Sequence, residues 1–354
     1  MIRVLVVDDS LTVRRTLCEI LARDPEIEVV GEAADGRRAL ELVAKLRPDV
    51  ITLDIVMPDM TGLAVTEEVM ANHPTPILVV SSSFNRGELF HTYSALSAGA
   101  VDVLDKPHLE DLDWERRFLA AVRMVAKIRV ITHVRGRLGL LGRGPVVVAP
   151  ARRPPTAEPD HAEARAPKLV ALGASTGGPG ALATVLAGIA PRFPLPILVV
   201  LHIDARFAVA FAEWLATQTN HDVRLASDGE LVVGGRVLIA PPDTHLTIVR
   251  GHVRLDGSPA RNYCRPSIDV LFESLATEYG PNVAACVLTG MGRDGAAGLL
   301  AIRNAGGMTI AQDEATSIIY GMPREAVARG AVERELPLGE IGPALDGLRN
   351  GGTA

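Results

Sequence analysis

The feature that most constrains this chain is a regular alternation of short β-branched runs with amphipathic runs, interrupted once by a proline-rich stretch. Such alternation predicts parallel sheets with helices on both faces. Between about residues 142 and 167, six prolines stand among alanines and arginines, which leaves little apolar surface to bury. We therefore predict an α/β chain of two doubly wound parallel-sheet domains, joined by an extended linker.

Composition limits the classes of protein to which the chain can belong. Its 354 residues are enough for two domains that each bury a core. A net charge of -6 and an aromatic content of 4% argue against a nucleic-acid partner, because such surfaces are basic and rich in stacking rings. The chain has three cysteines without C-x-x-C spacing, Cys18, Cys264 and Cys286. This number and spacing predict neither a disulfide framework nor a zinc site, and they favour a reducing compartment.

The sequence gives no sign of export or membrane insertion. Its N-terminus lacks the basic region, apolar segment and cleavage site of a signal peptide. The charge-free stretch from Leu169 to Pro191 is long enough to cross a bilayer, but glycines cluster within it, and we interpret it as strand, turn and helix. We therefore expect a cytoplasmic protein.

The first 125 or so residues have the pattern of one α/β domain. Asp35 is a candidate cap for an amphipathic helix that ends near Pro48. Strand-like runs occur at Ile2–Val7, Val50–Leu53, Ile77–Val80 and Val101–Leu104. In a parallel sheet the carboxyl ends of such strands lie at one edge, where open α/β folds bind ligands.

Three carboxylates are predicted to meet at this edge. Asp8 and Asp9 directly follow the first strand, and Asp54 follows the third. Converging carboxylates repel one another unless a cation joins them, and oxygen ligands suit a hard divalent ion. The sequence therefore predicts a Mg²⁺ site formed by Asp8, Asp9 and Asp54.

The same edge is predicted to accept a phosphoryl group. Asp54 is expected to attack a phosphohistidine donor and become an acyl phosphate. Lys106, after the fifth strand, supplies a positive charge for the phosphoryl oxygens, and Ser81, after the fourth, supplies a hydroxyl. Ser82 is the alternative hydroxyl. Taken alone, each of these residues could be a solvent-exposed polar group at the end of a strand. Because all of them are expected at the same edge of the sheet, a phosphoryl-binding site is the favoured interpretation.

Alternation resumes after the proline-rich stretch. Strand-like runs occur at Leu169–Leu172, Ile197–Leu201, Val237–Ala240 and Val283–Leu288, and a hairpin is expected from Thr247–Val249 and Val253–Leu255. Ser267 is a candidate cap for a helix whose apolar face carries Ile268, Leu271, Phe272 and Leu275.

A serine stands at the turn after the first of these runs. Gly173, Ser175 and Gly177 match the G-x-S-x-G pattern, in which a sharp strand-to-helix turn exposes a nucleophilic hydroxyl. The alternative interpretation is a serine- and glycine-rich turn without chemistry. A serine hydroxyl needs a base and a group that orients the base, so the remainder of the chain decides between the two.

One histidine and one aspartate are placed to assist the serine. His202 ends a strand-like run, as the serine turn ends another, and Asp294 lies in a glycine-punctuated loop after the strand at 283–288. Asp204 is a rival orienting group, two residues from His202 on the same segment. The other candidate histidines end no strand-like run: His221, His245 and His252. Cys264 is a less favoured nucleophile than Ser175, because no glycine turn presents its thiol.

Both halves resemble known families. Residues 1 to about 125 resemble a response-regulator receiver domain, through Asp8-Asp9, Asp54 with Met57-Pro58-Asp59, and Lys106-Pro107. Residues 168 to about 350 resemble the catalytic domain of the CheB protein-glutamate methylesterases, with residues 126–167 as helical extension and linker. The matching segments are Gly-Ala-Ser-Thr-Gly-Gly at 173–178, the strand ending in His202, Arg-Pro-Ser-Ile-Asp at 265–269, Leu-Thr-Gly-Met-Gly-Arg-Asp-Gly at 288–295 and Gln-Asp-Glu-Ala at 312–315.

This resemblance implies a flavodoxin-like receiver followed by a Rossmann-like serine-esterase domain with a β-hairpin. It implies Ser175 as nucleophile, His202 as base and Asp294 as orienting group, with oxyanion donors near Thr176 and Met291. The implied activity is phosphorylation-regulated hydrolysis of glutamate methyl esters, and deamidation of specific glutamines, on methyl-accepting chemotaxis receptors. A CheA-type histidine kinase is the implied phosphodonor, and the esterase site needs no cofactor.

The chain departs from the family pattern at several positions. Leu201, Ile203 and Asp204 flank the histidine where Gln-His-Met-Pro is usual, Cys264 replaces a common histidine, and Arg293 a common asparagine. The alternative function is a catalytically silent receiver-containing adaptor of a chemosensory array. A receiver with a DNA-binding output would need a basic recognition helix after the linker, and the sequence of the second half shows no obvious one.

Overall fold

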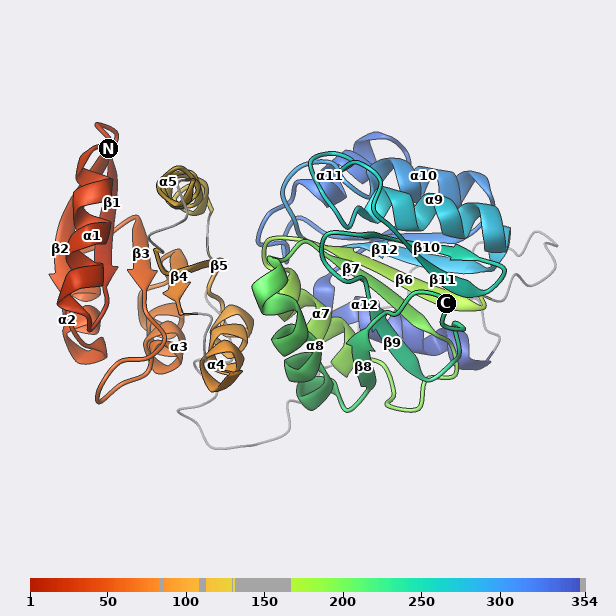
Figure 1. Ribbon diagram of the computed structural model, residues 1–354, viewed down its shortest axis with the longest axis horizontal. Helices are drawn as coiled ribbons and strands as arrows, with labels where there is room; N and C mark the ends of the chain where they lie inside the picture. The colour runs from red at the N-terminus through yellow and green to blue at the C-terminus, as the bar shows by residue number, and fades with distance from the viewer. Residues whose placement is uncertain (83–85, 108–112, 129, 131–166, 351–354) are drawn as a thin grey trace, which may run out of the picture.

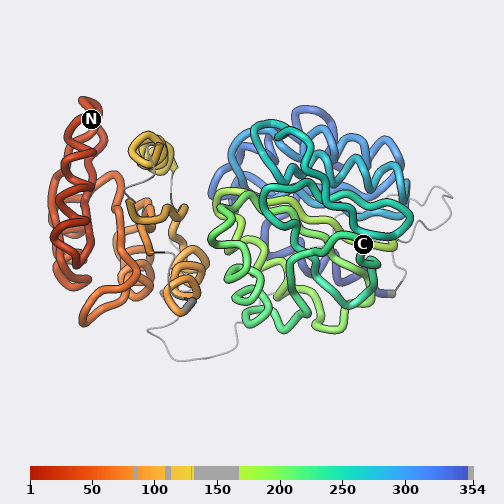
Figure 2. Tube along the Cα trace, viewed as in Figure 1, coloured from red at the N-terminus to blue at the C-terminus, as the bar shows by residue number. Residues whose placement is uncertain are grey.

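The computed structural model describes residues 1–82, 86–107, 113–128, 130 and 167–350, which form two α/β domains (Figures 1 and 2). Most of the expected helical extension and linker at 126–167 lies outside the described residues. Among the described residues, no helix combines the length and apolar character that crossing a bilayer requires.

The first domain is a five-stranded parallel sheet in the order β2-β1-β3-β4-β5, as expected for a flavodoxin-like receiver. Its elements are β1 (Ile2–Val7), α1 (Leu11–Ala22), β2 (Ile27–Ala33), α2 (Gly36–Leu46), β3 (Val50–Leu53), α3 (Gly62–Asn72), β4 (Ile77–Ser81), α4 (Arg86–Ser97), β5 (Asp102–Asp105) and α5 (Trp114–Val125). The predicted strands match β1 and β3 in full, and β4 and β5 within one residue.

Local side-chain chemistry sets where these helices begin. Ser10, Asp35 and Thr61 each accept a hydrogen bond from a backbone N–H in the first turn of α1, α2 and α3. The expected apolar face of α2 is buried at Ala39 and Val43. Together, these caps fix the residue at which each of the three helices begins.

The second domain is a seven-stranded parallel sheet in the order β14-β13-β12-β6-β7-β9-β8. Its strands are β6 (Leu169–Ala174), β7 (Ile197–Leu201), β8 (Asp222–Leu225), β9 (Arg236–Ile239), β12 (Val283–Val287), β13 (Met308–Gln312) and β14 (Arg334–Leu336). Its helices are α7 (Gly178–Ala187), α8 (Ala205–Thr219), α9 (Ile268–Tyr279), α10 (Ala296–Asn304), α11 (Met322–Ala328) and α12 (Leu338–Asp346). The chain builds β7 on one side of β6 and β12 on the other, so β6 stands where the strand order reverses.

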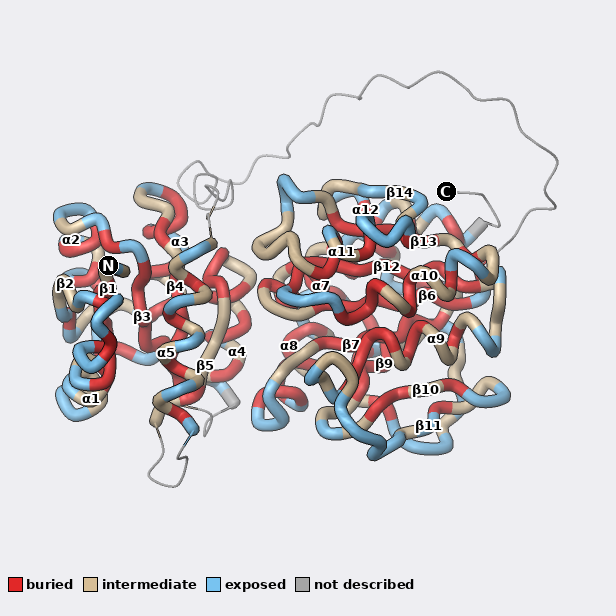
Figure 3. Tube along the Cα trace, turned by 90° about the horizontal axis from the view of Figure 1, so that it is seen from above, coloured by how far each residue is buried: buried red, intermediate tan, exposed pale blue. Residues whose placement is uncertain are grey.

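The expected hairpin is present as an antiparallel pair, β10 (His245–Val249) and β11 (His252–Asp256), separate from the main sheet. The pattern did not identify β8, β13 or β14. Edge strands β8 and β14 are short and half-exposed, which gives them a weak apolar signal. The central strands β6, β7 and β12 are buried along their whole length (Figure 3).

The two domains pack through α4 of the receiver and helices α7 and α8 of the second domain (Figure 1). The ring of Tyr93 packs against Phe211 and Trp214, with centroid separations of 5.3 and 5.4 Å. The hydroxyl of Tyr93 donates to the Phe207 carbonyl at 2.7 Å, and the Trp214 indole donates to Ser94 Oγ at 3.3 Å. Buried aromatic contacts with satisfied polar atoms make this a specific interface rather than a loose apposition.

Candidate functional site

Three neighbouring strands deliver the candidate catalytic residues to one edge of the second sheet. Ser175 follows β6, His202 follows β7, and Asp294 lies in the loop after β12. The ends of these strands are joined by backbone hydrogen bonds, from His202 N to the Ala174 carbonyl and from Ser175 N to the Thr289 carbonyl, each 3.1 Å long. Ser175 therefore stands between the segments that carry the other two residues.

Ser175 occupies a tight strand-to-helix turn. Its carbonyl accepts a 2.6 Å hydrogen bond from Gly178 N, where α7 begins. Gly177 has a φ of 77°, a left-handed conformation that a side chain would strain, and Ile318 fills the space where its Cβ would lie. The glycine pattern therefore has a local backbone reason that is independent of any catalytic role.

His202 and Asp294 are in direct contact. His202 Nε2 lies 3.0 Å from Asp294 Oδ2, and the two side chains are 16% and 2% exposed. The carboxylate is held from several sides, by the Ser267 hydroxyl at 2.7 Å, the Asn262 amide at 3.1 Å and the Ile268 N–H at 2.6 Å. An ionised carboxylate only accepts hydrogen bonds, so this pairing places a proton on Nε2 and leaves Nδ1 as the basic nitrogen.

Electrostatics reinforces this pair. Burial alone would lower the pKa of His202, but contacts with Asp294 and Cys264 outweigh it and raise the pKa to about 9. For Asp294, burial favours the neutral acid, yet the hydrogen bonds from His202 and Ser267 hold its pKa below the usual range. The carboxylate is therefore a permanent acceptor for His202.

The Nδ1 of His202 faces a cysteine. Cys264 Sγ lies 3.7 Å from this nitrogen, whereas no hydrogen bond links the Ser175 hydroxyl to His202 within the described part of the chain. The rival Asp204 is engaged elsewhere, since it caps α8 and pairs with Arg206. Of the other histidines, His221 contacts the Leu186 carbonyl in α7 and His252 contacts the Arg250 carbonyl. His245 contacts the Pro259 carbonyl and accepts a hydrogen bond from Ser267 N.

Two backbone N–H groups near the serine are candidates for binding an oxyanion. Neither the N–H of Thr176 nor that of Met291 donates a hydrogen bond among the described residues. Thr289 ties their loops together, because its hydroxyl donates to the Thr176 carbonyl at 3.1 Å. A built Cβ on Gly290 would come within 2.7 Å of Ser175 Cβ, so the two loops touch at the serine.

Sequence reasoning missed the residues that hold Asp294. Ser267 was expected only as a helix cap, and it does cap α9 while also donating to Asp294. Asn262 was not singled out, although its amide donates to both Asp269 and Asp294. The Arg-Pro-Ser-Ile-Asp segment at 265–269 was the available signal, since it delivers Ser267, Ile268 N–H and Asp269 together.

The acidic residues of the receiver also meet. Lys106 Nζ lies 2.8 Å from Asp54 Oδ2 and 3.0 Å from Asp8 Oδ2. Carboxylate oxygens of Asp8, Asp9 and Asp54 lie within 4.8 Å of one another, with Asp9 exposed and the other two buried. Among the described residues, none donates a hydrogen bond of good geometry to the buried Oδ2 of Asp8.

This donor set fits Mg²⁺. Burial raises the pKa of Asp54 to about 6 and raises that of Asp8, shifts that the Lys106 ammonium only partly offsets. The buried carboxylates of Asp8 and Asp54 therefore carry negative charge that Lys106 only partly offsets, and a divalent cation would stabilise their ionised forms. All the available ligands are oxygens, as Mg²⁺ prefers.

Ser81 is the last residue of β4, and its side chain is buried. Its hydroxyl contacts the Thr92 hydroxyl at 3.3 Å and the Ser82 carbonyl at 3.4 Å. These contacts aim it toward α4, and no hydrogen bond joins it to Asp54 in the described residues. Ser81 is therefore at the expected strand end, and its hydroxyl contacts Thr92 of α4, the helix that also carries Tyr93.

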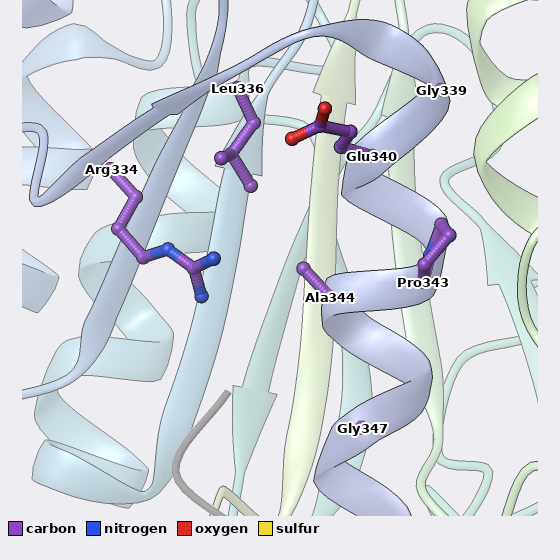
Figure 4. Close-up of a pocket in the computed structure, with 7 residues that line it drawn as sticks. All are labelled: Arg334, Leu336, Gly339, Glu340, Pro343, Ala344 and Gly347. Atoms are coloured by element: carbon purple, nitrogen blue, oxygen red, sulfur yellow. The ribbon is translucent and has the colours of Figure 1, made fainter. Parts of the chain in front are cut away.

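A groove of ≈ 440 Å³ lies elsewhere on the second domain, between β14 and α12 (Figure 4). Its lining is Arg334, Leu336, Gly339, Glu340, Pro343, Ala344 and Gly347. The candidate site residues do not line it. The chemistry-bearing side chains lie at the strand ends instead.

Fold and site together define a receiver domain joined to an α/β domain of hydrolase type, and comparisons with known proteins agree. Residues 4–113 match the family model for the response regulator receiver domain, and residues 170–345 match the model for CheB methylesterase. The chain belongs to the CheB methylesterase family, as an enzyme with a receiver domain in front.

Curated relatives and a solved structure support this membership. The protein-glutamate methylesterase/protein-glutamine glutaminase 2 of Anaeromyxobacter dehalogenans is 45% identical over 346 residues, covering 97% of this chain and 96% of the relative. The protein of the same name from Pseudomonas aeruginosa is 43% identical over 353 residues, with 97% and 96% covered. The Thermotoga maritima CheB methylesterase catalytic domain is 36% identical with a TM-score of 0.50, covering 51% of this chain and 98% of that one.

Proposed function

We propose that this protein hydrolyses glutamate methyl esters, and deamidates specific glutamines, on methyl-accepting chemotaxis receptors. The observation that carries the proposal is the 3.0 Å contact between His202 and Asp294 beside the Ser175 turn. The names of the full-length relatives support the activity. A cytoplasmic location, favoured by three free cysteines, is part of the proposal.

The proposed reaction is a two-step acyl transfer. Ser175 Oγ attacks the ester carbonyl while His202 Nδ1 takes the hydroxyl proton, and Asp294 stabilises the resulting imidazolium. The N–H groups of Thr176 and Met291 stabilise the oxyanion. Collapse transfers the proton to the leaving oxygen and releases methanol. Water then attacks the acyl-enzyme, again losing a proton to His202, and frees the glutamate and Ser175.

For this reaction Ser175 Oγ must approach His202 Nδ1. Hydrogen bonds between catalytic groups are often long without substrate and tighten in the complex. The missing serine–histidine hydrogen bond also fits the second candidate function, a catalytically silent adaptor. Methanol release from methylated receptor membranes separates the two, because an adaptor releases none.

Phosphorylation of Asp54 is proposed to control the esterase through the domain interface. Arg206, at the start of α8, donates a 2.6 Å hydrogen bond to Asp105, the neighbour of Lys106. Arg206 also pairs with Asp204, two residues after His202. A phosphoryl group on Asp54 adds a charge of about −1.5 to −2 beside Lys106. This charge is large enough to rearrange the ion pairs of Asp105, Arg206 and Asp204 and so weaken the contact between the two domains.

The receiver requires two partners under this proposal. A CheA-type histidine kinase donates the phosphoryl group to Asp54, and Mg²⁺ held by Asp8, Asp9 and Asp54 offsets its charge. Lys106 pairs with a phosphoryl oxygen, and Ser81 donates a hydrogen bond to the phosphoryl group once its hydroxyl turns from the Ser82 carbonyl. Because Val103 stands where many receivers carry an aromatic residue, this position has no ring to rotate, and the Asp105–Arg206 pair is the proposed connection to the esterase.

A further inference from the structure

Cys264 and His202 together have the geometry of a soft-metal site. The thiol sulfur lies 3.7 Å from the imidazole Nδ1, and the ligand atoms of Cys264, His202 and Asp294 lie within 4.8 Å of one another. Zinc bonds of about 2.3 Å to sulfur and about 2.0 Å to nitrogen, set at a tetrahedral angle, place the two ligand atoms about 3.5 Å apart. The observed separation therefore accepts a metal ion with little movement.

The second nitrogen of His202 supports the same conclusion. Histidines that bind metals usually donate their other N–H to a carboxylate, which fixes the ring and increases its basicity. Asp294 Oδ2 occupies this position at 3.0 Å from Nε2. Its hydrogen bonds to Ser267, Asn262 and Ile268 N–H keep Asp294 in the outer role, so it orients the ligand rather than binding the metal.

The cysteine is held in position by its own turn. Arg261 and Cys264 exchange backbone hydrogen bonds of 3.1 and 2.8 Å, and Asn262 and Tyr263 between them both adopt positive φ. Cys264 and His202 are both partly exposed, so an ion can reach them from solvent.

We propose that Cys264 Sγ and His202 Nδ1 bind a soft divalent cation such as Zn²⁺, and that this binding reversibly inhibits the esterase. Binding replaces the thiol proton with a sulfur–metal bond and releases the proton to solvent, while water completes the coordination. The metal takes the Nδ1 lone pair that would otherwise accept the proton from Ser175. The inhibition, unlike the binding itself, rests on the proposed function.

Cobalt provides a readout that does not depend on activity. The full-length protein, with Mg²⁺ in excess to occupy the receiver, is titrated with Co²⁺, and the sulfur-to-cobalt charge-transfer absorption is recorded. We expect this band in the wild type and in Cys18→Ser, which removes a half-buried thiol of the receiver. Cys264→Ser and His202→Gln should lose the band and at least about tenfold in affinity.

The outcomes separate the metal site from the proposed function. A wild type without the band, or a band that survives in Cys264→Ser, overturns the metal site. A Cys264-dependent band in a protein that releases no methanol upholds the site and rejects the esterase. If methanol is released, Zn²⁺ should suppress the release, and EDTA equimolar to the zinc should restore it while the excess Mg²⁺ still occupies the receiver. Cys264→Ser should resist Zn²⁺, and release by the wild type that Zn²⁺ leaves unchanged contradicts the inhibition.

Discussion

Arg206 donates a 2.6 Å hydrogen bond from its guanidinium to the buried carboxylate of Asp105, across the interface between the two domains. Asp105 ends β5 and precedes Lys106, which contacts Asp54. Arg206 lies four residues after His202. This pair therefore links the segment that carries the receiver's acidic site to the segment that carries His202.

Breaking this pair should activate the unphosphorylated protein. Arg206→Ala removes the pair with Asp204 inside the second domain and the interdomain pair with Asp105. Loss of the interdomain pair, worth about 1 kcal/mol, should raise the basal rate of methanol release about fivefold and make it respond less to a phosphodonor. Arg236→Ala is the matched control, because it breaks an ion pair with Asp222 inside the second domain only. Equal basal rates for Arg206→Ala, Arg236→Ala and the wild type would remove this contact from the regulatory scheme.

The esterase should require an alkaline pH for full activity. His202 must be neutral to accept a proton, and its pKa of about 9 means that kcat/KM should rise about tenfold for each pH unit below this value and then level off. Asp294→Asn removes a contact that raises this pKa, so the plateau should begin at lower pH and lie far lower. A rate profile that is level from pH 6 to about 9 would contradict the assignment of His202 as base.

The same shift affects stability. The pKa of His202 lies above its ordinary value of 6.5, so protonation favours the folded state. This contribution is fully present below about pH 6.5 and disappears as the pH rises to about 9. In urea unfolding, the loss in free energy of unfolding that His202→Gln causes relative to the wild type should be smaller at high pH than at neutral pH. A larger loss at high pH would rule out the raised pKa of His202.

A single methyl group at Gly290 should disturb the nucleophile. A Cβ there would lie 2.7 Å from Ser175 Cβ and 2.6 Å from Met322 Cε, so Gly290→Ala should cost about 1–3 kcal/mol in the free energy of unfolding and lower kcat. Gly339→Ala is the control, since its Cβ would meet nothing within 4 Å. Thermal unfolding and methanol release, measured on both variants, test the close approach; unchanged values for Gly290→Ala would argue against it.

Phosphorylation should depend on Asp54 and on a divalent cation. Asp54→Asn should abolish phosphoryl uptake from a small acyl-phosphate donor, and EDTA should do the same for the wild type, because the three carboxylates then lack their counter-charge. Asp59→Asn, a change at an exposed carboxylate in the same loop region, should leave uptake intact. Phosphate-affinity electrophoresis gives the readout, and uptake by Asp54→Asn would place the phosphoryl group elsewhere.

Sequence alone predicted the parts of the fold that depend on local pattern. The buried runs at β1, β3 and β7 and the capping residue Ser267 each carry their signal within a few neighbouring residues. The order of the strands let us expect Ser175, His202 and Asp294 at one edge. The short edge strands β8 and β14 escaped because half-exposed strands have little apolar contrast.

Contacts between distant loops could not be predicted in the same way. The approach of Cys264 to His202 depends on how the turn at 261–264 folds over β7, and no local pattern specifies that. The packing of Tyr93 against Phe211 and Trp214 likewise depends on the contact between two complete domains. Both features arise from tertiary packing and join residues more than 60 positions apart.

The most direct test of the proposed esterase is methanol release from methylated receptor membranes, compared between the wild-type protein and Ser175→Ala in the presence of a phosphodonor. The account predicts steady release by the wild type and a loss of about 10⁴-fold in kcat for Ser175→Ala, because members of a catalytic triad act as a unit. Undiminished release by Ser175→Ala would show that another group attacks the ester, and would contradict the account.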